Sequence, residues 1–151
     1  MIEEPKPTPV AEMKLYASEA WGFSIQYSQN WTVTEAEYQV SFQATPGVVL
    51  YVAVCPDVEI SVQALANRAD VVREDYPDLE TIYMGAYSTE AAEWWEMDVA
   101  YTEEGRKFSP IFLCTVENGT GYLIGTVAPC EELDRWQEDF VAVIDSFRFL
   151  P

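Results

Sequence analysis

The stretch WGFSIQYSQNWTV, residues 21–33, decides the fold of the chain. Apolar and polar side chains alternate over residues 23–27, which is the period of a strand with one buried face. Ser28-Gln29-Asn30 has the composition of a turn, and the apolar pattern resumes at Trp31. We therefore expect a strand, a tight polar corner and a large aromatic residue that enters the core, together beginning a sheet.

The overall composition is that of one acidic globular domain. The chain has 151 residues, enough to bury a core, and 49% of them are hydrophobic. Aspartate and glutamate number 26 against 8 lysine and arginine residues, which gives a formal charge of −18. A surface of this charge repels phosphate backbones and anionic lipid head groups. The composition therefore excludes nucleic acid as an expected partner.

The sequence contains no histidine. This excludes Ser-His-Asp and Cys-His catalysis, histidine zinc sites and the usual pH switch. No apolar run reaches the length of a membrane span. We expect no catalytic constellation and no cofactor.

The three cysteines, Cys55, Cys114 and Cys130, form neither a CxxC pair nor a dense disulfide framework. Cys55 and Cys130 both lie between a predicted strand and a predicted helix, so a disulfide between them would need neighbouring strands. We favour three free thiols that pack as small hydrophobic side chains.

Residues 1–13 hold three of the nine prolines and show no periodicity. They are predicted to be a flexible linker or tail, and residues 14–151 the folded domain. The linker is similar to the spacer between a lipid anchor and a folded domain, which implies an export signal and an anchor upstream of the given sequence. The alternative is the frayed terminus of a cytoplasmic protein.

Most of the remaining chain is predicted to form strands. Residues 48–55 are apolar on both faces, so this strand should lie centrally with cover above and below. Asn118-Gly119 is a strong hairpin signal. A hairpin closed over residues 118–121 would place Cys114 opposite Gly125. The predicted strands after the opening one are residues 38–43, 48–55, 79–87, 93–102, 107–117, 122–128 and 146–150.

Two segments have the apolar period of an amphipathic helix. One runs from Ser61, a capping residue, to about Tyr76 before Pro77, and the other covers residues 131–145. Hairpins dominate the order of elements, so the sheet should be mostly antiparallel. The fold class is therefore predicted to be α+β, a single-domain sandwich of a mostly antiparallel β-sheet flanked by two main α-helices.

Three short motifs resemble the PsbP-like superfamily, which also contains the Mog-type Ran-binding proteins and bacterial lipoproteins such as DcrB. The motifs are WGFSIQY at residues 21–27 leading into Asn30-Trp31, GYLI at residues 121–124, and IDSFRF at residues 144–149. The likeness extends over about residues 15–149. Ser28 stands where the family often has proline.

The resemblance implies an antiparallel sheet flanked by helices and no single activity. Members of the superfamily bind protein partners or assist larger complexes. A likeness of fold is an associational argument for function, so the site has to be argued from the residues.

Trp94, Glu96 and Asp98 share one face of the strand at residues 93–102, opposite Trp95, Met97, Val99 and Tyr101. An aromatic ring beside carboxylates is typical of a carbohydrate or peptide binding surface. The alternative, which we favour, is that Trp94 packs beneath a helix, because large aromatic side chains are more often buried than exposed.

The other acidic groups are best explained as solvated loops. None has the spacing of an EF-hand calcium loop, and any two of 26 carboxylates would serve as a glycosidase pair.

Three functions remain as hypotheses. The first is a non-catalytic extracytoplasmic binding or accessory module, the soluble domain of a bacterial lipoprotein that acts through protein–protein contacts. The second is a cytoplasmic chaperone or adaptor that holds apolar segments of a secreted cargo, which predicts a dimer with an exposed apolar patch. The third is a carbohydrate-binding module centred on Trp94, or a carboxylate-dependent hydrolase.

Overall fold

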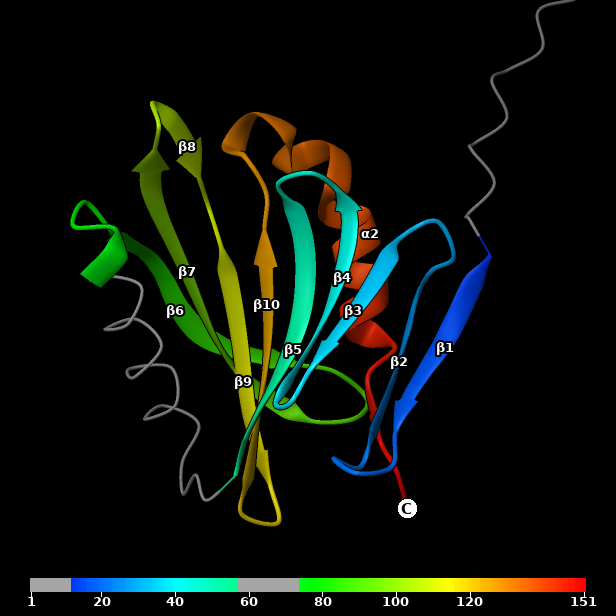
Figure 1. The fold of residues 1–151 in the computed structure, drawn as a ribbon. Helices are drawn as coiled ribbons and strands as arrows, with labels where there is room; N and C mark the ends of the chain where they lie inside the picture. Colours follow the sequence, from blue (N-terminus) through cyan, green and yellow to red (C-terminus); the bar gives the residue numbers. More distant parts are fainter. Residues whose placement is uncertain (1–11, 57–73) are drawn as a thin grey trace, which may run out of the picture.

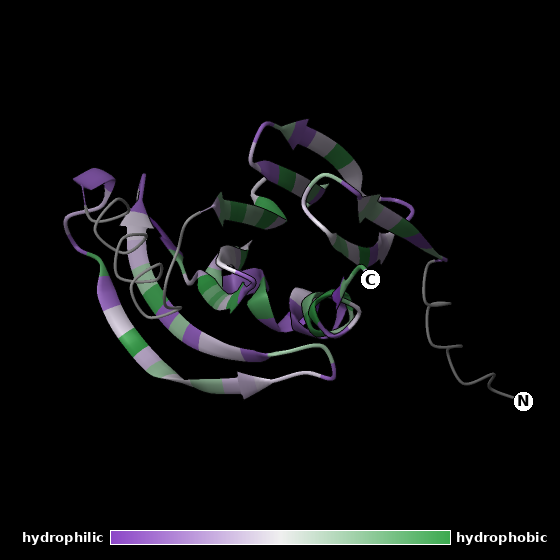
Figure 2. Cartoon of the chain, turned by 90° about the horizontal axis from the view of Figure 1, so that it is seen from below, coloured by the Kyte–Doolittle hydropathy of each residue, from purple (hydrophilic) through white to green (hydrophobic). Residues whose placement is uncertain are grey.

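The computed structural model describes residues 12–56 and 74–151, which form two sheets and the helix α2. The large sheet has the strand order β3-β4-β5-β10-β9-β7-β6, with β8 paired to β7, and the small sheet has the order β1-β2-β11. The large sheet curves so that α2 lies on its concave side, with the small sheet standing beside it (Figures 1 and 2).

The elements have the following bounds. The strands are β1 (Met13–Ser18), β2 (Phe23–Ser28), β3 (Thr32–Ala36), β4 (Gln39–Thr45), β5 (Val48–Pro56), β6 (Glu80–Ser88), β7 (Glu93–Glu103), β8 (Arg106–Phe108), β9 (Ile111–Glu117), β10 (Thr120–Val127) and β11 (Arg148–Phe149); the helices are the short 3-10 helix η1 (Cys130–Glu132) and α2 (Leu133–Asp145). The strand pairs among the described residues are antiparallel, which confirms that prediction.

The opening stretch forms the expected strand, corner and aromatic residue, but it spans two sheets instead of beginning one. β2 pairs with β1 and β11, whereas β3 pairs with β4 in the large sheet. Between them the Trp31 amide donates to the Ser28 carbonyl at 2.9 Å, and the indole of Trp31 is 8% exposed. The polar corner therefore redirects the chain from one sheet to the other, with Trp31 in the core as predicted.

The strand β5 is central, as its apolar faces predict. It lies between β4 and β10, and both of its faces carry buried side chains. Leu50 and Val52 belong to the main core under α2 and the small sheet, whereas Tyr51 belongs to a second cluster on the opposite face.

The hairpin of β9 and β10 closes over two residues, so the four-residue loop was a wrong prediction. Asn118 and Gly119 have positive φ values of 50° and 79°, the backbone of the tight turns that Asn-Gly favours. Cys114 consequently pairs with Leu123 and not with Gly125. The error is a shift of two residues, which leaves every side chain on its expected face because the strand period is two.

The expectation of two main helices is not borne out. Among residues 12–56 and 74–151, α2 is the one α-helix with both ends described. Most of the helix predicted from Ser61 to about Tyr76 lies outside the described residues, because these resume only at residue 74. The helix predicted at residues 131–145 is present as η1 and α2, and its apolar stripe is buried at Phe140, Val143 and Ile144.

Two further features complete the comparison with the sequence. The strand β1, which the sequence did not predict, pairs with β2 over residues 13–18. All three cysteines are free, as favoured above: Cys114 is buried, and Cys55 and Cys130 are half-buried. Burial raises the pKa of the Cys114 thiol to about 12, with a smaller contribution from Cys55.

The absence of a side chain at Gly125 makes space for the aromatic ring of Tyr51. Tyr51 is the cross-strand neighbour of Gly125, and a Cβ added at position 125 would overlap the Tyr51 ring. A Cβ added at Gly85 would likewise overlap the ring of Tyr83, which lies two residues earlier on the same strand, but Tyr51 is 5% exposed whereas Tyr83 is 47% exposed. The buried ring is held by its surroundings, and the exposed ring is free to swing away.

We predict that Gly125→Ala lowers the free energy of unfolding by about 1–3 kcal/mol, the usual cost of overpacking a filled core. Gly85→Ala is the matched control and should change it by less than about 0.5 kcal/mol, because the exposed Tyr83 ring can move. Urea denaturation of both variants measures the difference. Equal losses would contradict the argument.

Candidate functional site

A cavity of about 160 Å³ lies between α2 and the concave face of the large sheet. Its floor comes from the strands and its roof from the helix. Leu133, Gln137 and Val141 follow one another at steps of four residues, which places them on one face of α2. The lining residues are Tyr87, Glu96, Asp98, Ile111, Leu113, Thr126, Leu133, Gln137, Phe140, Val141 and Ile144.

The sheet register brings the polar residues of the floor together. Asp98 of β7 pairs with Ile111 of β9, which pairs in turn with Thr126 of β10, so the three form one row across the sheet. Glu96 lies two residues before Asp98 on the same face. Two carboxyl groups and one hydroxyl therefore meet an otherwise apolar space.

The carboxyl groups of Glu96 and Asp98 interact directly. Burial, followed by its hydrogen bond with Glu96 and the charge of Glu96, raises the pKa of Asp98 to about 7. Two carboxylates this close resist being ionised together. At neutral pH Asp98 is therefore partly protonated, and its carboxyl group hydrogen-bonds with Glu96.

Two polar atoms of the floor have no hydrogen-bond partner. They are Asp98 Oδ1 and Thr126 Oγ1. Thr126 as a whole residue is 2% exposed. Buried polar groups are rarely left without a partner because each costs free energy to desolvate. The cavity is therefore the place in the described chain where unsatisfied polar atoms and open space coincide.

Of the three residues that the sequence singled out, two line this cavity and one does not. Glu96 and Asp98 lie on its floor. Trp94 is 2% exposed, its ring meets Phe147 edge to face at 5.1 Å, and its Nε1 donates to Thr89 Oγ1 at 3.0 Å. The indole of Trp94 is therefore part of the buried core, which agrees with the alternative that we favoured from the sequence. It offers no surface on which a sugar ring could stack.

The sequence did not single out Thr126 or the helix residues of the cavity. One signal was present for Thr126, because it is a polar residue inside the apolar strand of residues 122–128. Its relation to Asp98 depends on the pairing of three strands, two of which are not adjacent in the sequence. Tyr87, at the end of β6, donates its hydroxyl to Asp145 Oδ1 at 3.2 Å and so connects this edge of the sheet to α2.

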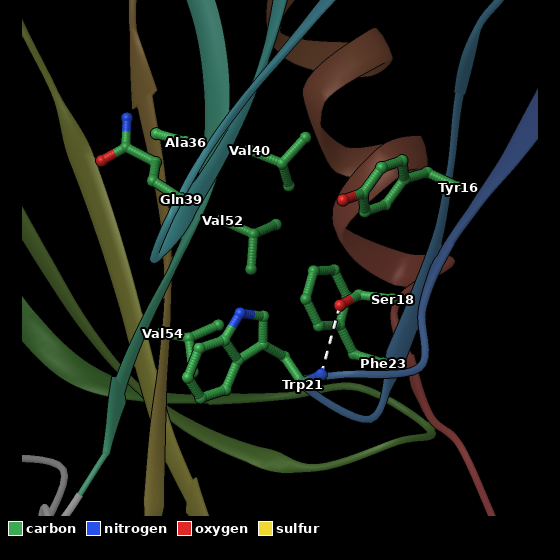
Figure 3. Close-up of a pocket in the computed structure, with 9 residues that line it drawn as sticks. All are labelled: Tyr16, Ser18, Trp21, Phe23, Ala36, Gln39, Val40, Val52 and Val54. Atoms are coloured by element: carbon green, nitrogen blue, oxygen red, sulfur yellow. Dashed lines mark hydrogen bonds between the residues drawn. The ribbon is translucent and has the colours of Figure 1, made fainter.

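A second cavity between the two sheets is only about 20 Å³, close to the space of one water molecule (Figure 3). Trp21 donates its amide to Ser18 Oγ at 3.2 Å beside it. It is a packing gap, too small for an organic ligand. Its lining residues are Tyr16, Ser18, Trp21, Phe23, Ala36, Gln39, Val40, Val52 and Val54.

The outer edge of the large sheet at β6 is exposed and apolar. β6 pairs with β7 on one side and is the last strand in the described sheet. Three large apolar residues project from it: Ile82 is 61% exposed, and Tyr83 and Met84 are 47% exposed each. We call these three residues the β6 patch.

Within residues 12–56 and 74–151, no group of three or more cysteine, aspartate or glutamate side chains is placed to hold a metal ion. No helix in this described part has both the length and the apolar character needed to span a bilayer.

Solved structures match this arrangement over nearly the whole chain. Cyanobacterial PsbP (CyanoP) from Synechocystis sp. PCC 6803 superposes with a TM-score of 0.71 at 12% sequence identity, over 97% of this chain and 97% of that one. The chain has a PsbP/Mog1-like fold. The resemblance of its opening motif to the PsbP-like superfamily is therefore confirmed at the level of fold.

Two further structures show the same PsbP/Mog1-like fold. The Ran-binding protein Mog1p of Saccharomyces cerevisiae gives a TM-score of 0.65 at 7% identity, covering 93% of this chain and 96% of its own. LpqN of Mycobacterium tuberculosis, involved in cell envelope biogenesis, gives 0.58 at 9% identity, covering 93% and 91%. No family model matches the sequence, and no curated protein matches it.

We predict that Asp98 makes the fold less stable as the pH rises. Its pKa is about 7 in the folded chain against 3.8 ordinarily, so the folded state binds this proton more tightly than the unfolded state does. The free energy of unfolding should therefore fall through this group between about pH 4 and about pH 7. In Asp98→Asn the urea midpoint should fall less over that interval than in the wild type.

The control is Glu138→Gln, which removes one charge from an exposed position on α2. Identical pH profiles for the two variants would show that Asp98 does not titrate as described.

Proposed function

We propose that this chain is a non-catalytic binding module that recognises a protein partner through β6, the edge strand of the described part of the large sheet. The observation that carries this proposal is the exposure of the β6 patch on an edge strand. An edge strand presents unpaired backbone N–H and C=O groups, and an extended segment of another chain can pair with them. Mog1p, which shares the fold, is a Ran-binding protein and so has a protein partner.

The two edge strands of the large sheet, β3 and β6, differ in length and in exposed apolar surface. β3, at the opposite edge, has five residues and the sequence TVTEA, which is mostly polar. β6 has nine residues and carries the β6 patch. Large exposed apolar side chains lie on β6 and not on β3, which favours a specific contact at β6.

The backbone of β6 limits where a partner strand can align. Thr81 pairs with Val99 and Tyr83 pairs with Asp98, so Ile82 is left out of the ladder as a bulge. Bulges at sheet edges interrupt indiscriminate pairing. The regular part, residues 83–88, is the segment on which a partner strand would align.

Charge indicates the chemistry of the partner. The chain carries −18, and Glu80 and Glu93 are exposed on the β6–β7 hairpin. Opposite charges steer association and suppress wrong partners. We therefore propose an extended apolar segment flanked by lysine or arginine.

The test is a peptide array in which apolar, β-forming segments carry either basic or acidic flanks. Basic peptides should bind the wild type, and Met84→Lys should weaken their binding at least tenfold because it places a cation on the exposed patch. Thr34→Lys on β3 changes the net charge equally and should leave binding within about twofold, since surface substitutions away from a contact have small effects.

Three outcomes would count against the proposal. They are no binding of any basic peptide, equal binding by both variants, and self-association of the chain that Met84→Lys abolishes. The last would make a second copy the occupant of the edge and would favour the dimeric chaperone hypothesis.

We also propose that the module works outside the cytoplasm, as the soluble part of a lipoprotein. The proline-rich composition of residues 1–13 supports this, as does the fold shared with LpqN, which is involved in cell envelope biogenesis. The codons upstream of Met1 test it: an apolar run followed by a lipobox cysteine is expected. A stop codon directly upstream in frame would favour the cytoplasmic chaperone or adaptor.

A further inference from the structure

We propose that the cavity under α2 is a binding site for a small primary amine with an apolar body, whose ammonium group contacts Asp98. This goes beyond the protein-binding role of the β6 edge and does not depend on it. The argument rests on the size of the cavity, the signs of its charges, its unsatisfied atoms and its access to solvent.

The size suits a ring or a short hydrocarbon chain. The cavity is about 160 Å³, and an apolar cavity of about 150 Å³ is known to hold a benzene molecule. Much of the wall is apolar. The apolar lining residues are Ile111, Leu113, Leu133, Phe140, Val141 and Ile144.

The charges are of one sign. Glu96 and Asp98 are acidic, and none of the lining residues in the described chain is lysine or arginine. Two arginines form ion pairs elsewhere, Arg106 with Glu131 and Glu132 and Arg148 with Glu90, and neither lines the cavity. A partly buried carboxyl pair without a cation is unfavourable, and an entering ammonium group would neutralise it.

The unsatisfied atoms are the observation that separates this site from an ordinary acidic cluster. Thr126 is 98% buried, lines the cavity and has no hydrogen-bond partner for its hydroxyl, and Asp98 Oδ1 also lacks one. An ammonium group has three donors and no acceptor, so it matches the free carboxylate oxygen. The Thr126 hydroxyl remains as a contact for a second polar group of the ligand.

The cavity is open to solvent on the side of the helix. Gln137 is exposed and Val141 is 39% exposed, although both line the cavity. A ligand could therefore enter past these two residues without unfolding α2.

Binding should depend on pH in a defined direction. The titratable side chains around the cavity are Glu96 and Asp98 on β7 and Tyr87 on β6, with Asp145 of α2 bound to the Tyr87 hydroxyl. Asp98 has to lose its proton for the full ion pair to form. Affinity for the amine should therefore rise from about pH 6 to about pH 8, where an alkylammonium keeps its charge.

The test is a calorimetric titration of the full chain with 2-phenylethylamine at about pH 6 and about pH 8. We expect saturable binding of one amine per chain, tighter at the higher pH. The neutral isostere 2-phenylethanol and the anion phenylacetate should bind at least tenfold more weakly, because neither provides a cation for the carboxyl pair.

The variants separate the cavity from attraction to the acidic surface. Asp98→Asn should weaken binding at least tenfold, whereas Glu138→Gln, which removes one exposed charge from α2, should bind as the wild type does. Val141→Phe fills the cavity from its exposed rim and should also abolish binding, so the test survives if Asp98→Asn fails to fold. Met84→Lys on the β6 patch should leave amine binding unchanged.

Two results would overturn the proposal. Equal binding by Asp98→Asn and Glu138→Gln would show attraction to the surface alone. The absence of saturable binding at millimolar amine would show that the cavity holds water only. Either result would leave the peptide test at β6 unaffected, so the two proposals fail separately.

Discussion

The structure depends on the contact between Phe23 and Phe147. The two rings stack with centroids 5.5 Å apart and planes inclined by 11°. Both are almost completely buried, and Trp94 and Tyr122 meet Phe147 edge to face. This cluster joins the beginning of the folded chain, its end and the middle of the large sheet, so it holds the small sheet against the large one.

The same cluster determines where α2 can lie. Phe147 follows the helix by two residues, and Phe140, Val143 and Ile144 belong to the same core. At the other end, Arg106 of β8 pairs with Glu131 and Glu132 of η1 at 2.6 and 3.1 Å. These exposed ion pairs contribute little to stability, but they mark the second point at which the helix region meets the sheet. Between the two points lies the cavity above Glu96 and Asp98.

Local patterns predicted much of the fold. Three features are each contained in a short stretch of sequence: the two apolar faces of residues 48–55, the Asn-Gly turn, and the apolar stripe at residues 131–145. The corresponding strands, hairpin and helix could therefore be predicted from local sequence alone. The division into two sheets could not, because it depends on β2 pairing with β11 from the far end of the chain. The strand β1 was missed because its sequence, MKLYAS, does not alternate between apolar and polar residues, and in the structure only Met13, Tyr16 and Ser18 are half-buried.

The candidate site was predictable to the same limited extent. Alternation along β7 placed Glu96 and Asp98 on one face, and the structure puts both on the floor of the cavity. Whether that face was open to solvent, covered by a helix or hollow depends on how α2 packs against strands distant in sequence. For the same reason the strand pattern alone did not connect Thr126 with Asp98.

The pairing of β2 with β11 also has a consequence for synthesis of the chain. Phe23 emerges from the ribosome early, but its cross-strand partner Phe149 lies 126 residues further along the chain. Contacts between residues so distant in sequence form late because the loop between them must first close. In a nascent chain the Phe23 ring therefore lacks the cover of β11 until residues 148–149 have been synthesised, and the small sheet is completed only after that segment has left the ribosome.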